Sequence, residues 1–455
     1  MPEEPTVDAI VLGAGPAGEA CAGRLAEGGM EVALVERELV GGECSYWACM
    51  PSKALLRPGD LAAEVGRVPG VRLAEPAIDP AAVLARRDEV IHELDDSAQL
   101  PWLQERGVKL IRGQGRLVGR RAVRVGDQLL RARRAVVVAT GSGPVLPPIP
   151  GLAEATPWTN HEVTTADHVP DRLLVLGGGV VGVEMAQAYA LLGASVALIE
   201  AEPRLLAREE DFAGEHVAEA LRRDGVDVRL GATASRVSRG ERQVRIELDG
   251  GDALLGDELL VAVGRRPRTH ELGLESVGLP AGETIAVDDR MQVPGDEWLF
   301  AIGDVNGRAL LTHAGKYQAR VAADVILGRD ARATADGPLS PRVVFTDPQV
   351  AAVGHTCASA EQAGLAVRAV DHPPGAVAGG SFTGHGADGL ARILVDQSRQ
   401  VIVGATFTGP EVAELLHAAT IAVVAEVPLD RLWHAIPSFP TRSEVWLRLL
   451  EKYGL

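Results

Sequence analysis

Apolar stretches of strand length recur along this chain, and each ends in glycine or in polar residues. The first, VDAIVLGAGPAG at 7–18, runs from an apolar strand into closely spaced glycines and then into a helical pattern. RLLVLGGGVVG at 172–182 repeats this order, and the apolar runs VALVE and ASVALIE follow the two units at 32–36 and 194–200. Strands that alternate with helices in this way predict α/β domains with mainly parallel sheets.

Further apolar runs predict strands between and after these two units. VVVATGS at 136–142, ELLVAVGRRPRT at 258–269 and WLFAIGDVNG at 298–307 each end in small or polar residues. The proline-rich GPVLPPIPG indicates a crossing between domains. From about residue 336 the pattern changes to strand-like VVFTDPQVAAVG, ARILVD and VIVGATF, followed by an apolar helix from Glu411 to Val424. This change predicts a separate α+β domain.

Length and charge narrow the class of protein. A chain of 455 residues exceeds one ordinary core and predicts two to four domains. A net charge of -17 argues against nucleic acid or an anionic membrane as a partner. The start MPEEPT has no basic segment followed by an apolar one, and no apolar run approaches the roughly 20 residues that span a bilayer. We therefore expect a cytoplasmic enzyme.

Residues 41–53 read GGECSYWACMPSK and hold two of the chain's four cysteines, Cys44 and Cys49. In a reducing compartment such a pair is more often catalytic or metal-binding than structural. A zinc site needs about four ligands, and no second CxxC or clustered histidine pair accompanies these cysteines. The pattern therefore favours a redox disulfide, and no metal is expected. Cys21 and Cys357 are expected to be small buried hydrophobic residues.

The spacing of the pair restricts the local backbone. Five residues of regular helix rise about 7.5 Å, which exceeds the limit of about 7 Å between the α-carbons of a disulfide. We therefore expect Cys44 to precede or begin a helical turn after Gly41 and Gly42, and Pro51 to disturb the helix one turn later. A thiol near a helix N-terminus has a lowered pKa, which suits redox exchange.

Both glycine units predict dinucleotide sites. In each, three glycines permit a tight turn and close approach of a pyrophosphate to the helix N-terminus, and an acid 23 residues after the first glycine accepts ribose hydroxyls. These residues are Gly13, Gly15, Gly18 and Glu36, and then Gly177, Gly179, Gly182 and Glu200. The charge of Glu200 favours NADH over NADPH, although Arg204 and Arg208 leave NADPH open.

The chain resembles the flavoprotein disulfide reductases over nearly its whole length. The resemblance rests on the two nucleotide units, the CxxxxC pair, ATG, AIGD, VFTDPQVAAVG and the final helical region. That family includes dihydrolipoamide dehydrogenase and mercuric reductase. The resemblance implies an FAD domain at 1–155 and 270–335, an NAD(P) domain at 156–269 and an interface domain at 336–455. It also implies a homodimer whose active sites each use both chains.

The resemblance also implies roles for single residues. The first glycine set and Glu36 would hold FAD with Asp304, and the second set and Glu200 would hold NAD. Cys49 would lie beside the flavin, and Cys44 would meet the substrate. Lys53 would pair with Glu184 near the flavin, where a cation stabilises negative charge on the reduced ring; a simple surface ion pair is the alternative. Further cofactor contacts are expected at Arg37, Gly42, Thr140, Gly141, Gly264 and His313.

The sequence departs from the family pattern near its C-terminus. Members that handle disulfides end in a motif like HPTxxE, whose histidine is an acid and base for the thiol of the neighbouring subunit. This chain reads SFPTRSE at 438–444, with Phe439 at the histidine position and Glu444 retained. His434 is an alternative base, or a partly buried interface residue. Upstream, Glu43, Tyr46, Trp47 and Ala48 are also unusual, and the two aromatic rings indicate a narrowed substrate pocket or core packing.

We therefore expect an FAD-dependent NAD(P)H oxidoreductase that passes electrons between NADH, FAD, the Cys44–Cys49 disulfide and a small thiol, disulfide or related sulfur substrate. One alternative is a diaphorase or quinone reductase, in which the flavin reduces its acceptor directly. A second is a thioether-cleaving reductase resembling 2-ketopropyl coenzyme M oxidoreductase/carboxylase, because an apolar residue at 439 would exclude a proton source. A flavin-binding scaffold is a third, which the retained cysteines, Lys53 and Glu184 oppose.

Overall fold

The structure, a computed structural model, describes residues 5–72 and 78–455. The chain divides into two compact units, each formed by three stretches of sequence. The first unit holds the chain up to residue 51 together with 88–144 and 265–337, and the second holds 52–87, 145–264 and 338–455. The boundaries of the FAD, NAD(P) and interface domains given above stay a prediction.

The first unit is built on a sheet whose central strands run parallel, in the order β16-β17-β6-β1-β2-β3. These strands are β1 (Thr6–Leu12), β2 (Val32–Glu36), β3 (Lys109–Arg112), β6 (Gln128–Val138), β16 (Gln292–Val293) and β17 (Asp296–Ala301). Alternate residues of β1 enter different cores, Ala9 and Val11 on one face and Ile10 and Leu12 on the other. Because both faces are covered, the strand is apolar throughout, as its sequence predicts.

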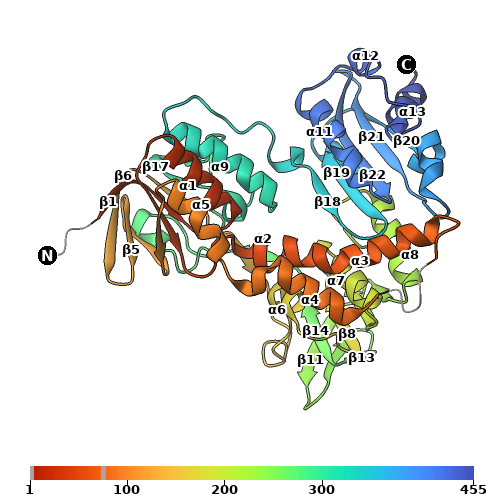
Figure 1. The fold of residues 1–455 in the computed structure, drawn as a ribbon, viewed down its shortest axis with the longest axis horizontal. Helices are drawn as coiled ribbons and strands as arrows, with labels where there is room; N and C mark the ends of the chain where they lie inside the picture. Colours follow the sequence, from red (N-terminus) through yellow and green to blue (C-terminus); the bar gives the residue numbers. More distant parts are fainter. Residues whose placement is uncertain (1–4, 73–77) are drawn as a thin grey trace. The chain divides into compact units, whose positions relative to one another are not determined.

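Helices cover one face of this sheet and an antiparallel extension covers the other. Figure 1 shows α1 (Pro16–Glu27) and α9 (Thr312–Ile326) lying side by side on the sheet. The remaining elements of the unit are α2 (Gly42–Tyr46), α5 (Leu100–Glu105), β4 (Gly115–Gly119), β5 (Ala122–Val125), β7 (Ser142–Pro144), β15 (Arg265–Pro267) and the short 3-10 helices η1 (His92–Leu94), η2 (Ser97–Gln99), η3 (Leu274–Val277) and η4 (Gly303–Asn306).

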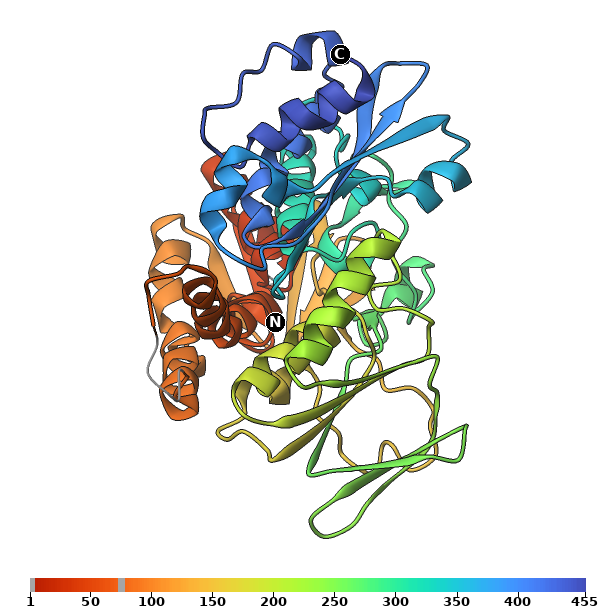
Figure 2. The same ribbon diagram turned by 90° about the vertical axis from the view of Figure 1, so that its right-hand side faces the viewer.

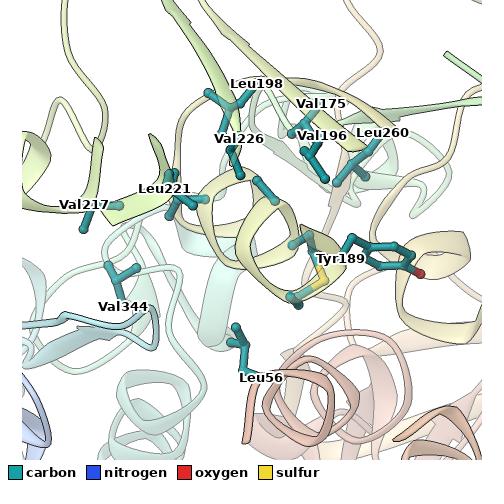
Figure 3. Close-up of a cluster of buried hydrophobic side chains, with 14 of the residues drawn as sticks. Leu56, Val175, Tyr189, Val196, Leu198, Val217, Leu221, Val226, Leu260 and Val344 are labelled. Carbon is teal, nitrogen blue, oxygen red and sulfur yellow. The ribbon is translucent and has the colours of Figure 1, made fainter. Parts of the chain in front are cut away.

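The second unit repeats the arrangement with a parallel sheet in the order β10-β9-β8-β14. Its elements are α6 (Asn160–Thr165), β8 (Arg172–Leu176), α7 (Val180–Leu191), β9 (Ser195–Glu200), α8 (Asp211–Arg223), β10 (Asp227–Leu230), β14 (Glu258–Val261) and the antiparallel strands β11 (Ala234–Arg239), β12 (Val244–Leu248) and β13 (Ala253–Gly256). Figure 3 shows part of its core, in which Val175 and Leu198 from the sheet meet Leu221 of α8 and Tyr189 of α7. This core holds α7 firmly, which matters because α7 carries Glu184.

The C-terminal part of the second unit is an antiparallel sheet in the order β18-β19-β22-β21-β20 (Figure 2, blue). Its elements are β18 (Arg342–Val344), β19 (Gln349–Gly354), α10 (Cys357–Gln362), β20 (Val367–His372), β21 (Ala391–Asp396), β22 (Val401–Gly409), α11 (Leu416–Val424), α12 (Leu429–Leu432), α13 (Glu444–Tyr453) and the 3-10 helices η5 (Gly337–Leu339), η6 (Pro374–Ala376), η7 (Ala378–Thr383) and η8 (Val412–Leu415). Helices α11 and α13 share one core with the sheet. The predicted α+β segment is therefore confirmed, and the predicted helix 411–424 is divided into η8 and α11.

The segment with the two cysteines forms two helices. Helix α2 ends at Tyr46 and α3 (Cys49–Arg67) begins at Cys49, so the segment is not one plain helix, as its spacing predicted. The predicted position of the break was wrong, because it falls at Trp47 and Ala48 and not at Pro51. Pro51 is the third residue of α3, where the missing N–H costs no hydrogen bond within the helix. The next helix of the chain, α4, spans Pro80–Val90.

Among the described residues, no helix combines the length and the apolar composition that crossing a bilayer requires.

Candidate active site

The first glycine unit forms a tight strand-to-helix turn. Gly13 has φ of +100°, and a Cβ built there would lie 2.5 Å from the carbonyl oxygen of Ala139. A Cβ on Gly18 would lie 1.9 Å from the carbonyl oxygen of Gly13, so only glycine fits both positions. A Cβ on Gly15 would meet nothing within 4 Å, which leaves open space before the N-terminus of α1. Glu36, at the end of β2, accepts hydrogen bonds from the N–H of Ala14 and of Glu38 at 2.6 and 2.7 Å.

The second glycine unit has the same geometry. Gly177 has φ of +111°, and its Cβ would lie 2.6 Å from the carbonyl oxygen of Ala262. A Cβ on Gly182 would lie 1.9 Å from Gly177, and one on Gly179 would meet nothing within 4 Å. Glu200 accepts hydrogen bonds from the N–H of Gly178 and, at 2.8 Å, of Glu202. Each unit therefore combines an open helix N-terminus with a fixed carboxylate at the end of the next strand, as expected for a dinucleotide site.

The two cysteines of the first unit are brought together as thiols. Cys49 is the first residue of α3, and its Sγ lies 3.4 Å from Thr312 Oγ1, at the start of α9. The Cys44 side chain forms hydrogen bonds with Cys49 and with Thr312. One hydroxyl at a helix N-terminus therefore serves both sulfur atoms.

The Cys44 thiol differs from the expectation of a lowered pKa. The hydrogen bond with Cys49, burial and the negative charge of Cys49 raise the pKa of Cys44. The hydrogen bond with Thr312 and the charge of Lys316 oppose this rise. Cys44 is the third residue of a helix of only five residues, so little helix dipole acts on it. The thiolate of Cys44 therefore depends on nearby side chains.

Lys53 and Glu184 form an ion pair within the second unit, as predicted. Lys53 Nζ lies 2.7 Å from Glu184 Oε2, and Glu184 Oε1 accepts a hydrogen bond from the N–H of Phe345 at 2.9 Å. Glu184 is 2% exposed, and the Lys53 ammonium lies 4.8 Å from the centre of the Phe345 ring. A carboxylate with two partners in a buried position holds the ammonium in one place, so this is no ordinary surface ion pair.

Asp304 belongs to a network of charges in the first unit. Its Oδ2 accepts a hydrogen bond from Ser142 Oγ at 2.6 Å, and Ser142 Oγ in turn accepts one from Arg265 Nε at 2.7 Å. Glu43, the residue before Cys44, forms ion pairs with Arg268 at 2.6 Å and Arg265 at 3.2 Å. Burial raises the pKa of Asp304, and Ser142 and the two arginines counteract it. The unusual glutamate at position 43 is thus neutralised by two guanidinium groups.

The other predicted cofactor residues lie in loops or in the first turn of a helix. Gly42 approaches the first glycine unit, since its Cβ would lie 2.8 Å from Gly15 Cα. Gly141 and Thr140 are joined to Arg268 by hydrogen bonds, with Thr140 Oγ1 donating to the Arg268 carbonyl at 3.0 Å. Arg37 forms an ion pair with Glu38 at 3.1 Å. The carbonyl of Gly264 accepts a hydrogen bond from the N–H of Val145 at 3.0 Å. His313 is exposed in the first turn of α9.

The C-terminal motif separates into an exposed and a buried part. Phe439 is 77% exposed, and His434 is also exposed in the chain. Glu444 is buried in the first turn of α13, where it accepts a long hydrogen bond of 3.4 Å from the N–H of Gly379. The retained glutamate therefore has a structural contact of its own within the second unit.

The structure decides between the two interpretations of Tyr46 and corrects the expectation for Cys357. Tyr46 is 1% exposed with its ring 5.8 Å from that of Trp47, so it belongs to the core and not to a substrate pocket. Burial raises its pKa to about 12. Cys357 is only partly buried and contacts Arg392 at 3.6 Å, whereas Cys21 is buried as expected. The packing of the surrounding helices and strands determines how far Tyr46 and Cys357 are buried.

The structure adds residues that were not predicted, namely Thr312, Arg265 and Arg268. Thr312 is 263 residues from Cys49, so no sequence spacing could have linked them. The arginines lie in the basic segment GRRPRT, in which Arg265 begins β15. Their positive charge and the negative charge of Glu43 were the only sequence signals for this contact.

Two dinucleotide units and a close thiol pair in one chain define an oxidoreductase that uses a pyridine nucleotide, and family comparison agrees. Residues 7–320 match the model of pyridine nucleotide-disulphide oxidoreductases, and 340–449 match the dimerisation domain of the same family. The chain belongs to the pyridine nucleotide-disulphide oxidoreductase family, which confirms the predicted family and fold class.

Individual relatives are similar over almost the whole chain. Dihydrolipoyl dehydrogenase of Thermus scotoductus is 35% identical, over 96% of this chain and 95% of that protein. The corresponding enzyme of Haloferax volcanii is 31% identical, over 97% and 95%. The Cu(II) complex of the HOCl-induced flavoprotein disulfide reductase RclA from Escherichia coli has a TM-score of 0.86 at 28% identity, over 98% of this chain and 99% of that one.

The family uses FAD and a pyridine nucleotide, and the residues of this chain fit both groups. In each glycine unit the middle glycine leaves open space before a helix N-terminus, which suits a pyrophosphate. Gly13, Gly15, Gly18 and Glu36 would hold one dinucleotide, and Gly177, Gly179, Gly182 and Glu200 the other. When bound, FAD would accept a hydride and pass electrons on to sulfur.

Proposed function

We propose that this protein is an FAD-dependent, NADH-using oxidoreductase that exchanges electrons with a small disulfide, dithiol or related sulfur substrate through a Cys44–Cys49 disulfide. It acts as a homodimer in the cytoplasm. The observation that carries the proposal is the contact of both thiols with each other and with Thr312. A pair held this closely can form a disulfide with little backbone movement.

The preference for NADH rests on the second glycine unit. The Glu200 carboxylate at the end of β9 would repel a ribose 2'-phosphate. Arg204 donates hydrogen bonds to the carbonyls of Glu209 and Ala207 and forms an ion pair with Asp211 at 3.2 Å. Its positive charge is therefore neutralised within the protein. Both features favour a ribose with an unmodified 2'-OH.

Homodimer formation is supported by the matched dimerisation domain at 340–449 and by its exposed apolar side chains. Ile421 is 55% exposed, Ile436 is 90% exposed and Phe439 is 77% exposed. Apolar side chains of this size on one segment indicate a surface that a second copy covers.

The residues of the chain would divide the work as follows. The Lys53 ammonium, which Glu184 holds in place, would stabilise negative charge on the reduced flavin ring. The electron pair that NADH supplies would reach Cys49 and cleave the Cys44–Cys49 disulfide, which leaves Cys44 to exchange with substrate. The Cys44 thiolate attacks one sulfur of a substrate disulfide and expels the other as a thiolate, which takes a proton from water. Cys49 then attacks the Cys44 sulfur, releases the second substrate thiol and restores the disulfide.

Replacing single cysteines tests the proposal. Cys44→Ser and Cys49→Ser should each abolish NADH-dependent reduction of disulfides and NAD-dependent oxidation of dithiols, while Cys357→Ser, the matched control, keeps both. The substrate panel should contain lipoamide, low-molecular-weight disulfides, thioethers, quinones and Cu(II). In the unaltered enzyme, NADH titration should produce the long-wavelength band of a thiolate beside flavin. Disulfide turnover by Cys44→Ser would overturn the proposal.

A second candidate is a diaphorase or quinone reductase, and the phenylalanine at position 439 favours it because thiol exchange there lacks an imidazole. Phe439→His distinguishes the two. If exchange is the natural reaction and is limited by proton transfer, this variant should raise lipoamide turnover at least about tenfold. Unchanged lipoamide turnover together with quinone reduction that survives Cys44→Ser would favour the diaphorase.

A further inference from the structure

Helices α1 and α9 of the first unit pack closely against each other (Figure 1), and α9 begins at Thr312, whose hydroxyl contacts the two thiols. A Cβ built on Gly315 of α9 would lie 3.2 Å from Ala17 Cβ of α1, so the helices meet at this level. Thr312, which binds both thiols, and Lys316 are four residues apart on α9 and therefore face the same side. Glu19 lies in the first turn of α1, two residues after Ala17.

Lys316 is a cation whose charge acts on the Cys44 thiol. Within the described residues its ammonium makes no hydrogen bond or ion pair, so no carboxylate neutralises it at short range. Its charge lowers the pKa of Cys44, in the same direction as the hydrogen bond from Thr312. Burial and Cys49 act in the opposite direction. Lys316 therefore favours the thiolate that substrate exchange requires.

Glu19 is a partly buried carboxylate close to the same cation. In the described part of the chain no hydrogen bond or ion pair reaches it, in contrast to Glu184. Burial raises the pKa of Glu19 to about 7, the charge of Lys316 on α9 lowers it, and that of Glu36 on β2 raises it. Tyr46 of α2 is a further neighbour, since the charge of Glu19 raises its pKa. Glu19 thus changes charge near neutral pH.

We propose that Lys316 stabilises the Cys44 thiolate and that Glu19, when ionised, offsets the charge of Lys316. This inference deepens the proposed function and rests on it. The pair provides electrostatic control at the exchange thiol in a chain that carries phenylalanine at position 439. In the exchange step described above, Lys316 lowers the cost of the attacking anion, whereas Glu19 acts only through Lys316 and is a positioning residue.

The test measures the reactivity of the Cys44 thiol directly. The FAD-loaded enzyme with Cys49→Ser and Cys357→Ser leaves Cys44 as the accessible thiol, since Cys21 is buried. Its alkylation by iodoacetamide is followed from pH 6 to pH 10. Because Lys316 is exposed, Lys316→Met should slow alkylation at pH 7 by about two- to fivefold and move the profile to higher pH. Lys316→Arg should restore the original profile.

Glu19→Gln should act in the opposite direction. It should speed alkylation by about twofold at pH 8, where Glu19 is ionised, and have little effect at pH 6, where the carboxyl is protonated. Arg320→Met, which removes another exposed cation of α9, is the matched control and should leave the profile unchanged. Flavin absorbance verifies that each variant is folded, and Lys316→Gln serves as a second neutral replacement.

The outcomes separate this inference from the proposed function. Profiles of Lys316→Met and Lys316→Gln identical to that of the parent would overturn the inference, as would equal effects of Glu19→Gln at pH 6 and pH 8. Disulfide turnover by Cys44→Ser would instead overturn the proposed function. The alkylation assay needs no substrate, so one can fail while the other holds.

Discussion

The two glycine-rich units of this chain share a backbone but differ in what their helices carry. The Cβ clashes at Gly13 and Gly177 are 2.5 and 2.6 Å, and those at Gly18 and Gly182 are both 1.9 Å. Helix α7 is almost wholly buried and its Glu184 is held by Lys53 and the N–H of Phe345. Glu19 on α1 has no such partner in the described residues. The glycines therefore determine what binds at the N-terminus of each helix. The carboxylate within the helix, Glu19 in α1 and Glu184 in α7, can then have a different role in each unit.

The largest expected effect comes from removing the cation that Glu184 holds. Lys53→Met should slow reduction of the bound flavin by NADH about a hundredfold, because a preorganised charge at a developing anion is typically worth that much. Stopped-flow absorbance measures the rate. Lys109→Met, on the exposed edge strand β3, is the control. An unchanged rate for Lys53→Met would contradict a catalytic role for the cation that Glu184 holds. The functional contrast between Glu184 and Glu19 would then be lost.

A methyl group at the closest glycine should disable one unit alone. Gly182→Ala forces a Cβ against the Gly177 carbonyl, so NADH should bind about ten- to a hundredfold more weakly, as expected for overpacking that costs about 1–3 kcal/mol. Flavin content should stay normal, and dithionite should still reduce the flavin. Gly66→Ala, where the Cβ meets nothing within 4 Å, should have no effect on NADH binding. Loss of flavin from Gly182→Ala would show that the two units are not independent.

The carboxylates at the strand ends should differ in which nucleotide they select. Glu200→Ser removes the charge that opposes a 2'-phosphate and should lower KM for NADPH about tenfold relative to that for NADH. Steady-state kinetics with both nucleotides measure the ratio. Glu36→Ser should reduce flavin affinity without moving this ratio. A shift of the ratio by Glu36→Ser would reverse the assignment of the two units.

The smallest effect concerns stability and pH. Burial raises the pKa of Asp60 on α3 to about 6, and the charges of Asp347 and Glu184 contribute to the rise. The folded state thus binds a proton more tightly than the unfolded state, whose Asp titrates near 3.8. Stability is therefore lost as pH rises from about 4 to about 6. Asp60→Asn should be more stable than the parent by about 1 kcal/mol at pH 7, after allowance for partial exposure.

Urea unfolding at pH 4 and pH 7 checks this prediction. The difference between parent and Asp60→Asn should appear at pH 7 and nearly vanish at pH 4. A constant difference at both pH values would mean that the substitution acts through packing and not through charge.

The sequence alone determined the two nucleotide units, the family and the close approach of the cysteines. Strand, glycines, helix and acid lie within about 30 residues of each other, where local backbone geometry decides the structure. It also predicted that Lys53 and Glu184 pair, through resemblance to the family. The break between α2 and α3 was expected but misplaced, because Pro51 is compatible with the first turn of a helix.

Only the tertiary structure decided what surrounds the sulfur atoms. Thr312 and Lys316 of α9 act on Cys44, α9 packs against α1 through Gly315 and Ala17, and Tyr46 enters the core. Such contacts join residues far apart in the chain, and no local preference specifies them. Close packing of helices and strands does so, because each face must bury its apolar side chains against one particular partner.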